Sequence, residues 1–296
     1  MKIISLTPSG TEIIASLDLL DDLVGRSHEC NFPKEVEGKT KVTSSNMRND
    51  VSLCQIDSFV KESKKTGSNI YEINEKIIVE IQPDYIVTQG LCDVCAISEA
   101  QVYGSLAAQK ESLRLKPKVL SLSGYLIEDI MNDIQRLGKV FDRVEKAEKL
   151  IEKARESIRD LKKKPKIAKS VLFLEWVNPF FAPGHWIPEQ INLAGFEAVL
   201  GRPGAKSREI SVSSIIEVDP DYIVVACCGL GFEENKKIAY QLYDNLAISR
   251  LKAFSNKNVF AFDADSYFSR PTLRLLEGAR QMRVALSTQS SVYRCA

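Results

Sequence analysis

The pentapeptide Pro-Asp-Tyr-Ile-Val occurs twice in the chain, at residues 83–87 and 220–224. When the two copies are aligned, residues upstream of them also match, including Glu72 with Glu209 and Ile78 with Ile215. An internal match at a separation of about 140 residues indicates domain duplication, because solenoid repeats are much shorter. The chain is therefore expected to contain two similar units.

Each copy of the pentapeptide begins a predicted strand that is apolar on both faces, at 85–88 and 222–226. Such strands are typical of parallel sheets, which are covered by helices on both sides. Helical patterns alternate with short apolar runs in both halves of the chain, which predicts an α/β fold. We expect two Rossmann-like lobes with parallel sheets, at residues 1–124 and 165–296.

The segment at 125–164 has a different pattern. From Ile127 to Leu161, apolar residues recur at steps of three, four or seven, charged residues fill the rest, and Pro165 follows. This spacing predicts one amphipathic helix of roughly 35 residues, about 50 Å long at 1.5 Å per residue. We interpret it as a rigid helix that connects the two lobes. A helix that pairs with a coiled-coil partner is the alternative.

Composition narrows the class of protein. With 44% hydrophobic and 27% charged residues, the chain is expected to be a soluble globular protein and a monomer. A formal net charge of +1 gives no reason to expect nucleic acid or an anionic membrane as a partner. We find no membrane span and no secretory signal. The location predicted from the chain as given is cytoplasmic, or periplasmic or otherwise extracytoplasmic if a leader has been removed.

The candidate site is expected where the predicted strands end, because ligands of open parallel α/β sheets bind beyond the carboxyl ends of the strands. Both histidines, both tryptophans and five of the seven cysteines fall in these loops. The candidate ligand-binding residues are His28, Glu29, Cys92, Asp93, Cys95, Glu175, Trp176, His185, Trp186, Cys228, Tyr267 and Arg270.

Several of these residues have a structural alternative. Cys227 and Cys228 close an apolar strand, and the alternative is that one of them simply packs, as free cysteines often do. The tryptophans suit a flat, partly apolar ligand, or a hydrophobic plug between the lobes. Arg270 suits an anionic group of a ligand, or a helix that begins after Pro271.

A second interpretation is a metal site. His28, Cys30, Cys92, Cys95 and His185 offer the nitrogen and sulfur ligands that zinc or another thiophilic metal prefers. This predicts a cytosolic Cys/His metal-binding protein or metalloenzyme with its site in the same cleft. An enzyme with Cys92 or Cys95 as nucleophile is a third interpretation. Because phosphate-binding loops and a nucleophile elbow are absent, we expect a binding protein rather than an enzyme.

Particular segments also resemble a known family. Residues 4–12, 23–25 and 83–87 are similar to those of the periplasmic cobalamin-binding proteins of ABC importers, a group of two-lobed metal-chelate receptors. The likeness covers essentially the whole chain. Segments 27–30, 91–95, 175–176, 184–186 and 267–271 resemble a Cys/His-rich subgroup of that family.

The resemblance implies a corrinoid such as cobalamin, or a similar metal chelate, held between two lobes that move little because the connecting helix is stiff. It also implies an ABC permease that docks on the lobes. In the receptors, a glutamate seven residues before each Pro-Asp engages arginines of the permease. Those positions are Lys76 and Ser213 in this chain. The docking glutamates are therefore absent, and binding without docking is the alternative.

Overall fold

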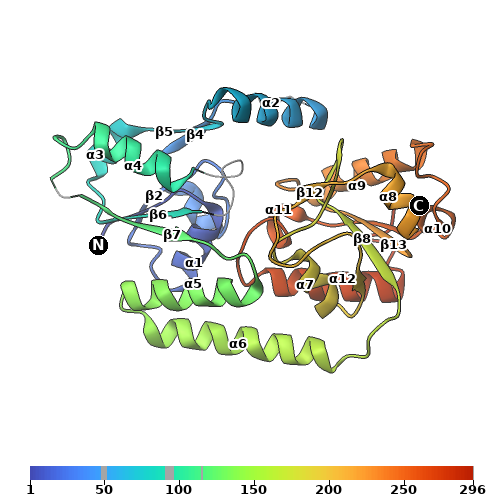
Figure 1. The fold of residues 1–296 in the computed structure, drawn as a ribbon. Helices are drawn as coiled ribbons and strands as arrows, with labels where there is room; N and C mark the ends of the chain where they lie inside the picture. The colour runs from blue at the N-terminus through green and yellow to red at the C-terminus, as the bar shows by residue number, and fades with distance from the viewer. Residues whose placement is uncertain (48–51, 91–96, 115, 296) are drawn as a thin grey trace. The chain divides into compact units, whose positions relative to one another are not determined.

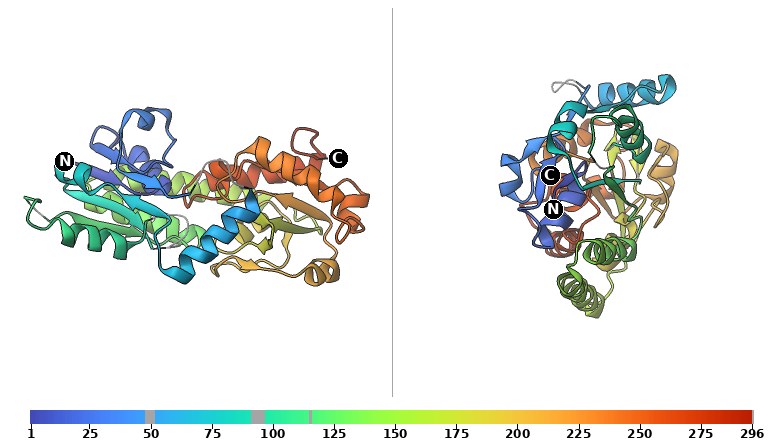
Figure 2. Two further views of the ribbon diagram at one scale, coloured as in Figure 1. Left: turned by 90° about the horizontal axis from the view of Figure 1, so that it is seen from above. Right: turned by 90° about the vertical axis from the view of Figure 1, so that its left-hand side faces the viewer.

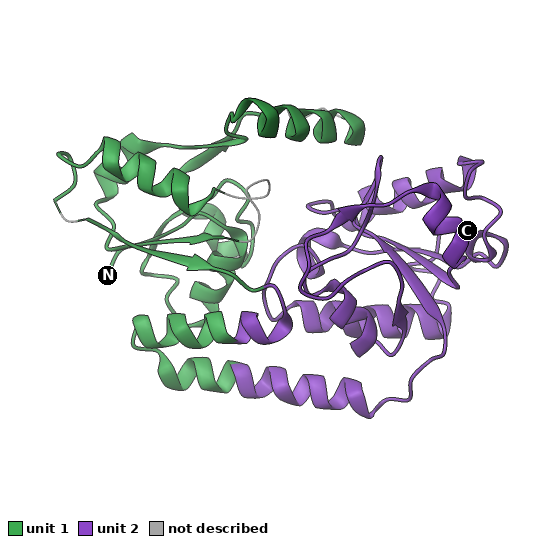
Figure 3. Cartoon of the chain, in the orientation of Figure 1, with its two compact units in different colours: residues 1–124, 132–150 green, residues 125–131, 151–296 purple. Residues whose placement is uncertain are grey.

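The computed structural model describes residues 1–47, 52–90, 97–114 and 116–295, which fall into two units (Figures 1 and 3). Unit 1 comprises residues 1–124 and 132–150, and unit 2 comprises residues 125–131 and 151–296. Each unit has its own parallel sheet and its own buried core.

Unit 1 is built on a five-stranded sheet in the order β3-β2-β1-β6-β7, in which every neighbouring pair is parallel. Its strands are β1 (Ile3–Ser5), β2 (Leu23–Arg26), β3 (Thr40–Lys41), β6 (Tyr85–Gln89) and β7 (Lys118–Leu122). The helices of unit 1 before residue 124 are α1 (Pro8–Ser16), η1 (Lys34–Gly38), α2 (Leu53–Thr66), α3 (Glu75–Ile81) and α4 (Glu99–Ala108).

A separate antiparallel pair, β4 (Thr43–Ser45) and β5 (Tyr71–Ile73), extends from this unit. In Figures 1 and 2 the pair carries α2 away from the five-stranded sheet. The structure has two short strands, β3 and β4, in different sheets.

Helices cover both faces of the five-stranded sheet. Ile4 and Ile86 pack on one face in a core that includes Ile78 of α3 and Val102 of α4. On the other face α1 approaches so closely that a Cβ on Gly10 would lie 2.8 Å from Val87 Cγ1. Sheet side chains are therefore buried on both faces, which explains the continuous apolar runs in the sequence.

Unit 2 contains a four-stranded parallel sheet in the order β11-β8-β13-β14. Its strands are β8 (Ser170–Leu174), β11 (Glu197–Ala198), β13 (Tyr222–Val225) and β14 (Val259–Ala261). A second sheet, antiparallel in the order β12-β10-β9, consists of β9 (Trp176–Val177), β10 (Phe180–Ala182) and β12 (Arg208–Glu209). Its helices after residue 165 are α7 (Ile187–Leu193), α8 (Val212–Val218), α9 (Phe232–Gln241), η2 (Leu242–Asp244), α10 (Lys252–Ser255), α11 (Ala264–Tyr267) and α12 (Leu275–Thr288).

The predicted duplication is confirmed in the elements before the pentapeptide. Helix α3 and helix α8 occupy equivalent positions and have equal lengths. Each has a side-chain N-cap, Asn74 and Ser211 respectively, and each ends at a residue with left-handed backbone, Gln82 and Asp219. The strands that follow, β6 and β13, both lie beside the strand that opens their unit.

The aspartate of the pentapeptide joins two strands in each unit. The carboxylate of Asp84 accepts a hydrogen bond from the backbone N–H of Lys2, at 2.7 Å. The carboxylate of Asp221 accepts one from the backbone N–H of Ser170, at 2.9 Å. These donors immediately precede or begin β1 and β8, so the aspartate fixes the start of the neighbouring central strand.

We expect the stability of unit 2 to fall in acid, because the carboxylate of Asp221 becomes protonated. Partial burial raises the pKa of Asp221, but hydrogen bonds from Ser170 and Lys169 outweigh burial and bring the pKa down to about 2. An unfolded aspartate has a pKa of about 3.9. The carboxylate therefore stabilises unit 2 above pH ~4, by roughly 1–2 kcal/mol after allowance for solvent screening, and this is lost as the pH falls towards ~2.

Urea unfolding followed by tryptophan fluorescence measures this effect, because both tryptophans of the chain belong to unit 2. The stability difference between wild type and Asp221→Asn should shrink between pH 5 and pH 2. The matched variant in unit 1 is Asp84→Asn. A stability difference independent of pH for Asp221→Asn would contradict the prediction.

The predicted single helix over 127–161 is corrected by the structure, which has two helices, α5 (Ile127–Val140) and α6 (Val144–Lys163). The chain turns at Asp142, whose backbone is left-handed with φ 55°. The two helices pack closely after this turn, because a Cβ on Gly138 would lie only 2.5 Å from the Cβ of Ala147. The division between the units falls within both helices (Figure 3).

Candidate functional site at the strand ends

Because the main sheet of each unit is parallel, the loops after its strands leave from one edge of that sheet. In unit 1 this edge carries the loop 27–30 after β2 and the loop that follows β6. The predicted residues Cys92, Asp93 and Cys95 lie outside the described residues. In unit 2 the edge carries Glu175 after β8, Cys227 and Cys228 after β13, and residues 262–270 after β14.

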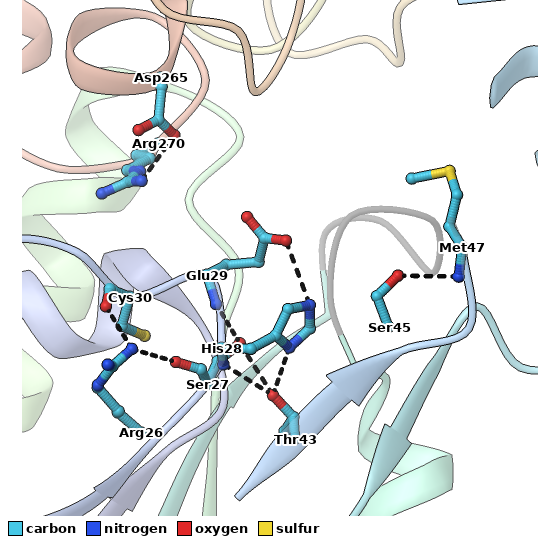
Figure 4. Close-up of polar contacts among 10 residues, drawn as sticks. All are labelled: Arg26, Ser27, His28, Glu29, Cys30, Thr43, Ser45, Met47, Asp265 and Arg270. Carbon is cyan, nitrogen blue, oxygen red and sulfur yellow. Dashed lines mark hydrogen bonds and ion pairs between the residues drawn. The ribbon is translucent and has the colours of Figure 1, made fainter. Parts of the chain in front are cut away.

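The imidazole of His28 lies between Thr43 and Glu29 (Figure 4). Its Nδ1 lies 2.7 Å from Thr43 Oγ1, and its backbone N–H donates to the same oxygen at 3.0 Å. Its Nε2 lies 3.2 Å from a carboxylate oxygen of Glu29. The ring of Tyr71 lies 5.2 Å from the imidazole, centroid to centroid. The side chains of His28 and Glu29, two of the predicted ligand-binding residues, thus contact each other. Thr43, which also contacts His28, was not among the predicted residues.

A buried arginine shapes the loop that carries His28. Arg26 is 4% exposed, and its guanidinium donates to the backbone carbonyls of Ser27, Cys30 and Glu37. The thiol of Cys30 is buried, and Thr11 Oγ1 donates to its sulfur at 3.0 Å. Cys30 therefore packs inside unit 1, although it had been predicted as a metal ligand.

In unit 2, Glu175 and Trp176 follow the central strand β8. The backbone N–H of Cys228 donates to the carbonyl of Glu175 at 3.0 Å, which joins the ends of β8 and β13. Trp176 is half-buried, and its indole N–H donates to the carbonyl of Asn178 at 3.1 Å. This bond fixes the orientation of an indole that remains partly exposed on unit 2.

His185 does not follow a strand of the parallel sheet; it follows β10 of the small antiparallel sheet. Its φ of 50° is unusual for a residue with a side chain. Hydrogen bonds fix its backbone, with its N–H donating to Ala205 and its carbonyl accepting from Gly204. The ring lies 5.4 Å from that of Tyr125.

The surroundings of His185 favour the neutral form of its imidazole. Burial lowers its pKa, and the positive charge of Lys206 lowers it further. Its Nδ1 is covered and has no hydrogen-bond partner among the described residues. Backbone strain combined with an unsatisfied buried nitrogen is more frequent at binding sites than in ordinary core positions.

Trp186 lies in the core of unit 2. It is 3% exposed, and its indole N–H donates to the carbonyl of Phe268 at 3.0 Å. Of the two predicted aromatic contacts, Trp176 is thus the one that unit 2 presents at its surface. The role of Trp186 in ligand binding stays a prediction, and its observed contacts are structural.

The adjacent thiols after β13 have different surroundings. Cys227 is buried, and burial together with the neighbouring Cys228 raises its pKa to about 12, whereas Cys228 is exposed. Asn235 of α9 holds this turn and is fully buried. Its side-chain oxygen accepts from the N–H of Cys227 at 2.7 Å, and its amide donates to three backbone carbonyls, those of Leu230, Gly231 and Phe262. Sequence reasoning missed Asn235, because a polar residue in a helical pattern gives no sign of burial.

The residues after β14 make polar contacts with one another. Arg270 is 6% exposed and forms an ion pair with Asp265 at 2.6 Å. The guanidinium of Arg274 lies over the ring of Tyr267, 5.1 Å from its centroid. Arg270 is therefore already paired within unit 2.

Metal ligation finds limited support in the part of the chain that the structure describes. It contains no group of three or more His, Cys, Asp or Glu side chains placed to hold a metal ion. His28 and Cys30 do not converge, since Cys30 bonds to Thr11. The remaining thiol candidates, Cys92 and Cys95, lie outside the described residues.

Known proteins share this chain's architecture. A vitamin B12-binding protein from Vibrio parahaemolyticus is 25% identical over 281 residues, which cover 93% of this chain and 85% of that protein. The crystal structure of the periplasmic vitamin B12-binding protein BtuF of Vibrio cholerae has a TM-score of 0.67 at 18% identity, covering 97% of this chain and 96% of its own. That of the periplasmic heme-binding protein HutB of the same species has a TM-score of 0.71 at 18% identity, covering 97% and 98%.

These likenesses confirm the predicted fold class, two α/β lobes with parallel sheets of the class III binding-protein type. None of the helices in the described ranges is long and apolar enough to cross a membrane. The family model for periplasmic binding proteins matches residues 3–266. The chain therefore belongs to the periplasmic binding protein family.

Proposed function

We propose that this protein binds a corrinoid such as cobalamin, or a similar metal chelate, as the substrate-binding component of an ABC importer. The observation that carries the proposal is the 25% identity to a vitamin B12-binding protein, which extends over 93% of the chain. A heme-binding protein with the same fold supports the broader class of planar metal chelates.

The side chains at the strand ends suit such a ligand. Trp176 offers a partly exposed indole of fixed orientation, which fits the flat face of a macrocycle. The half-exposed carboxylate of Glu29 offers an acceptor for amide substituents at its rim.

Binding of cyanocobalamin, followed by its visible spectrum in equilibrium dialysis, tests the proposal. We expect saturable binding of one ligand per chain with a Kd below about 10 µM, which corresponds to roughly 7 kcal/mol. Failure to bind cyanocobalamin and hemin at tens of micromolar would contradict it. Metal analysis of the wild type and of a Cys92→Ser/Cys95→Ser variant separates the alternative, a Cys/His metal-binding protein.

Removal of the half-buried indole of Trp176 should weaken binding. We expect Trp176→Ala to raise the Kd for cyanocobalamin about tenfold, because the loss of an aromatic contact costs roughly 1–1.5 kcal/mol. Trp176→Phe keeps a ring and should lose less. Isothermal titration of the three proteins measures the effect. Equal affinities would show that the indole does not contact the ligand.

The proposed partner is an ABC permease, and the proposed location is the extracytoplasmic side of a membrane. Both proposals are supported by the family to which the chain belongs. The equivalent helices α3 and α8 carry Lys76 and Ser213 at their second positions, where the resemblance implies glutamates. We therefore propose that docking does not use carboxylates at these two positions.

A further inference from the structure

The hydrogen bonds around His28 define which ring nitrogen carries the proton. Thr43 Oγ1 donates its one proton to Ser27 Oγ, at 3.2 Å. The same oxygen accepts from the backbone N–H of His28, so its remaining acceptor position faces His28 Nδ1 at 2.7 Å. An N–H is needed on Nδ1 to complete this contact. In the neutral ring, the lone pair must then be on Nε2.

This Nε2 has no hydrogen-bond partner among the described residues and is covered from solvent. The nearest carboxylate oxygen, that of Glu29, lies 3.2 Å away without the alignment of a hydrogen bond. A lone pair and a carboxylate at this distance repel each other unless a positive charge lies between or beside them. Glu29 is half exposed, so its side chain has room to move from the nitrogen (Figure 4).

A histidine that ligates a metal usually donates Nδ1–H to an oxygen of the protein, which leaves the lone pair of Nε2 to bind the metal. One imidazole is too few ligands for a free ion such as zinc, which takes four. A metal already held by a macrocycle needs only one more donor. The local geometry therefore suits a chelated metal better than a free ion.

We propose that His28 Nε2 ligates the metal of the bound chelate directly, and that Thr43 positions the ring for this contact. The proposal rests on the proposed function. In the exchange, a bond between the metal and a water molecule breaks, the Nε2 lone pair forms a bond to the metal, and the water leaves without a change in oxidation state. The protein should then prefer chelates that have an exchangeable coordination position.

Two corrinoids that have the same macrocycle and different axial ligands provide the test. Diaquocobinamide has exchangeable water on both faces of its cobalt, and dicyanocobinamide has both faces blocked. Wild type is expected to bind the diaquo form at least about tenfold more tightly. The visible spectrum of the bound diaquo form should shift to that of diaquocobinamide in excess free imidazole. His28→Ala should bind both forms equally and produce no shift.

Variants at Thr43 separate positioning from folding. Thr43→Val removes the acceptor for Nδ1–H and should weaken binding of the diaquo form about tenfold, with no change for the dicyano form. Thr43→Ser keeps the hydroxyl and should restore the preference. Thermal unfolding of each variant shows whether unit 1 is intact.

The outcomes distinguish the two proposals. Equal binding of both cobinamides by wild type, or the same spectral shift in His28→Ala, would overturn the ligation by His28 and leave the proposed function standing. Binding of neither cobinamide, nor of cyanocobalamin or hemin, would overturn both.

Discussion

Replacement of Asn235 by alanine is expected to destabilise unit 2 by about 3 kcal/mol. Asn235 is fully buried and makes four hydrogen bonds to the backbone, one with the N–H of Cys227 and three with carbonyls. Alanine leaves these groups buried without partners, and each unsatisfied group costs roughly 1–3 kcal/mol before the structure relaxes or water enters. The loop that carries Cys228 should lose its fixed position as well.

Urea unfolding monitored by tryptophan fluorescence reports this change, since both tryptophans are in unit 2. Asn235→Asp is the more specific variant, because a carboxylate still accepts from Cys227 but cannot donate to the three carbonyls. Lys237→Ala, at an exposed position of the same helix, is the control and should change the stability by less than about 0.5 kcal/mol. A stability equal to that of wild type in Asn235→Ala would show that water replaces the amide.

Gly184→Ala is expected to have the second large effect, a loss of at least about 2 kcal/mol together with weaker ligand binding. A Cβ at this position would lie 2.2 Å from the carbonyl oxygen of Ala205 and 2.6 Å from backbone atoms of Lys206 and Ser207. Backbone cannot rotate away as a side chain can, so the two segments must separate. His185, which bonds to Ala205, would then be displaced.

The unfolding midpoint of unit 2 and the Kd for cyanocobalamin measure the two parts of this prediction. Gly104→Ala is the matched control, because nothing lies within 4 Å of its Cβ and it occupies the exposed side of α4. Alanine there should stabilise unit 1 by roughly 0.5–1 kcal/mol through helix propensity. Unchanged stability in Gly184→Ala would mean that the segment at 205–207 adapts without strain.

Much of the fold could be predicted because the duplication constrains both halves at once. The pentapeptide fixed the positions of β6 and β13, and the match upstream of it extends to α3 and α8 with their caps. What periodicity could not reveal is the break between α5 and α6. The apolar spacing continues through Phe141 and Val144, while the turn depends on the left-handed backbone of Asp142, which the apolar pattern does not encode.

The candidate site was predicted less completely, because the position of a residue at a strand end does not specify where its side chain points. Trp186 and Cys30 both follow the expected pattern, yet they pack inside their units. Thr43 and Asn235 were missed for the opposite reason. Thr43 acts through its contacts with His28, and Asn235 acts through hydrogen bonds to the turn after β13 and to Phe262. A single threonine or asparagine carries no periodic signal of such contacts.

The equivalent caps and strand-joining aspartates of the two units also bear on how such a protein changes over evolutionary time. Residues 74–89 and 211–226 have the same arrangement of helix, turn and strand, and each is tied to its own sheet by the same carboxylate bond. Each strand is therefore fixed at its start, at the opposite end from the loop that follows it. One scaffold can be retained while two separate loops diversify, so ligand preference can drift in small, independent steps.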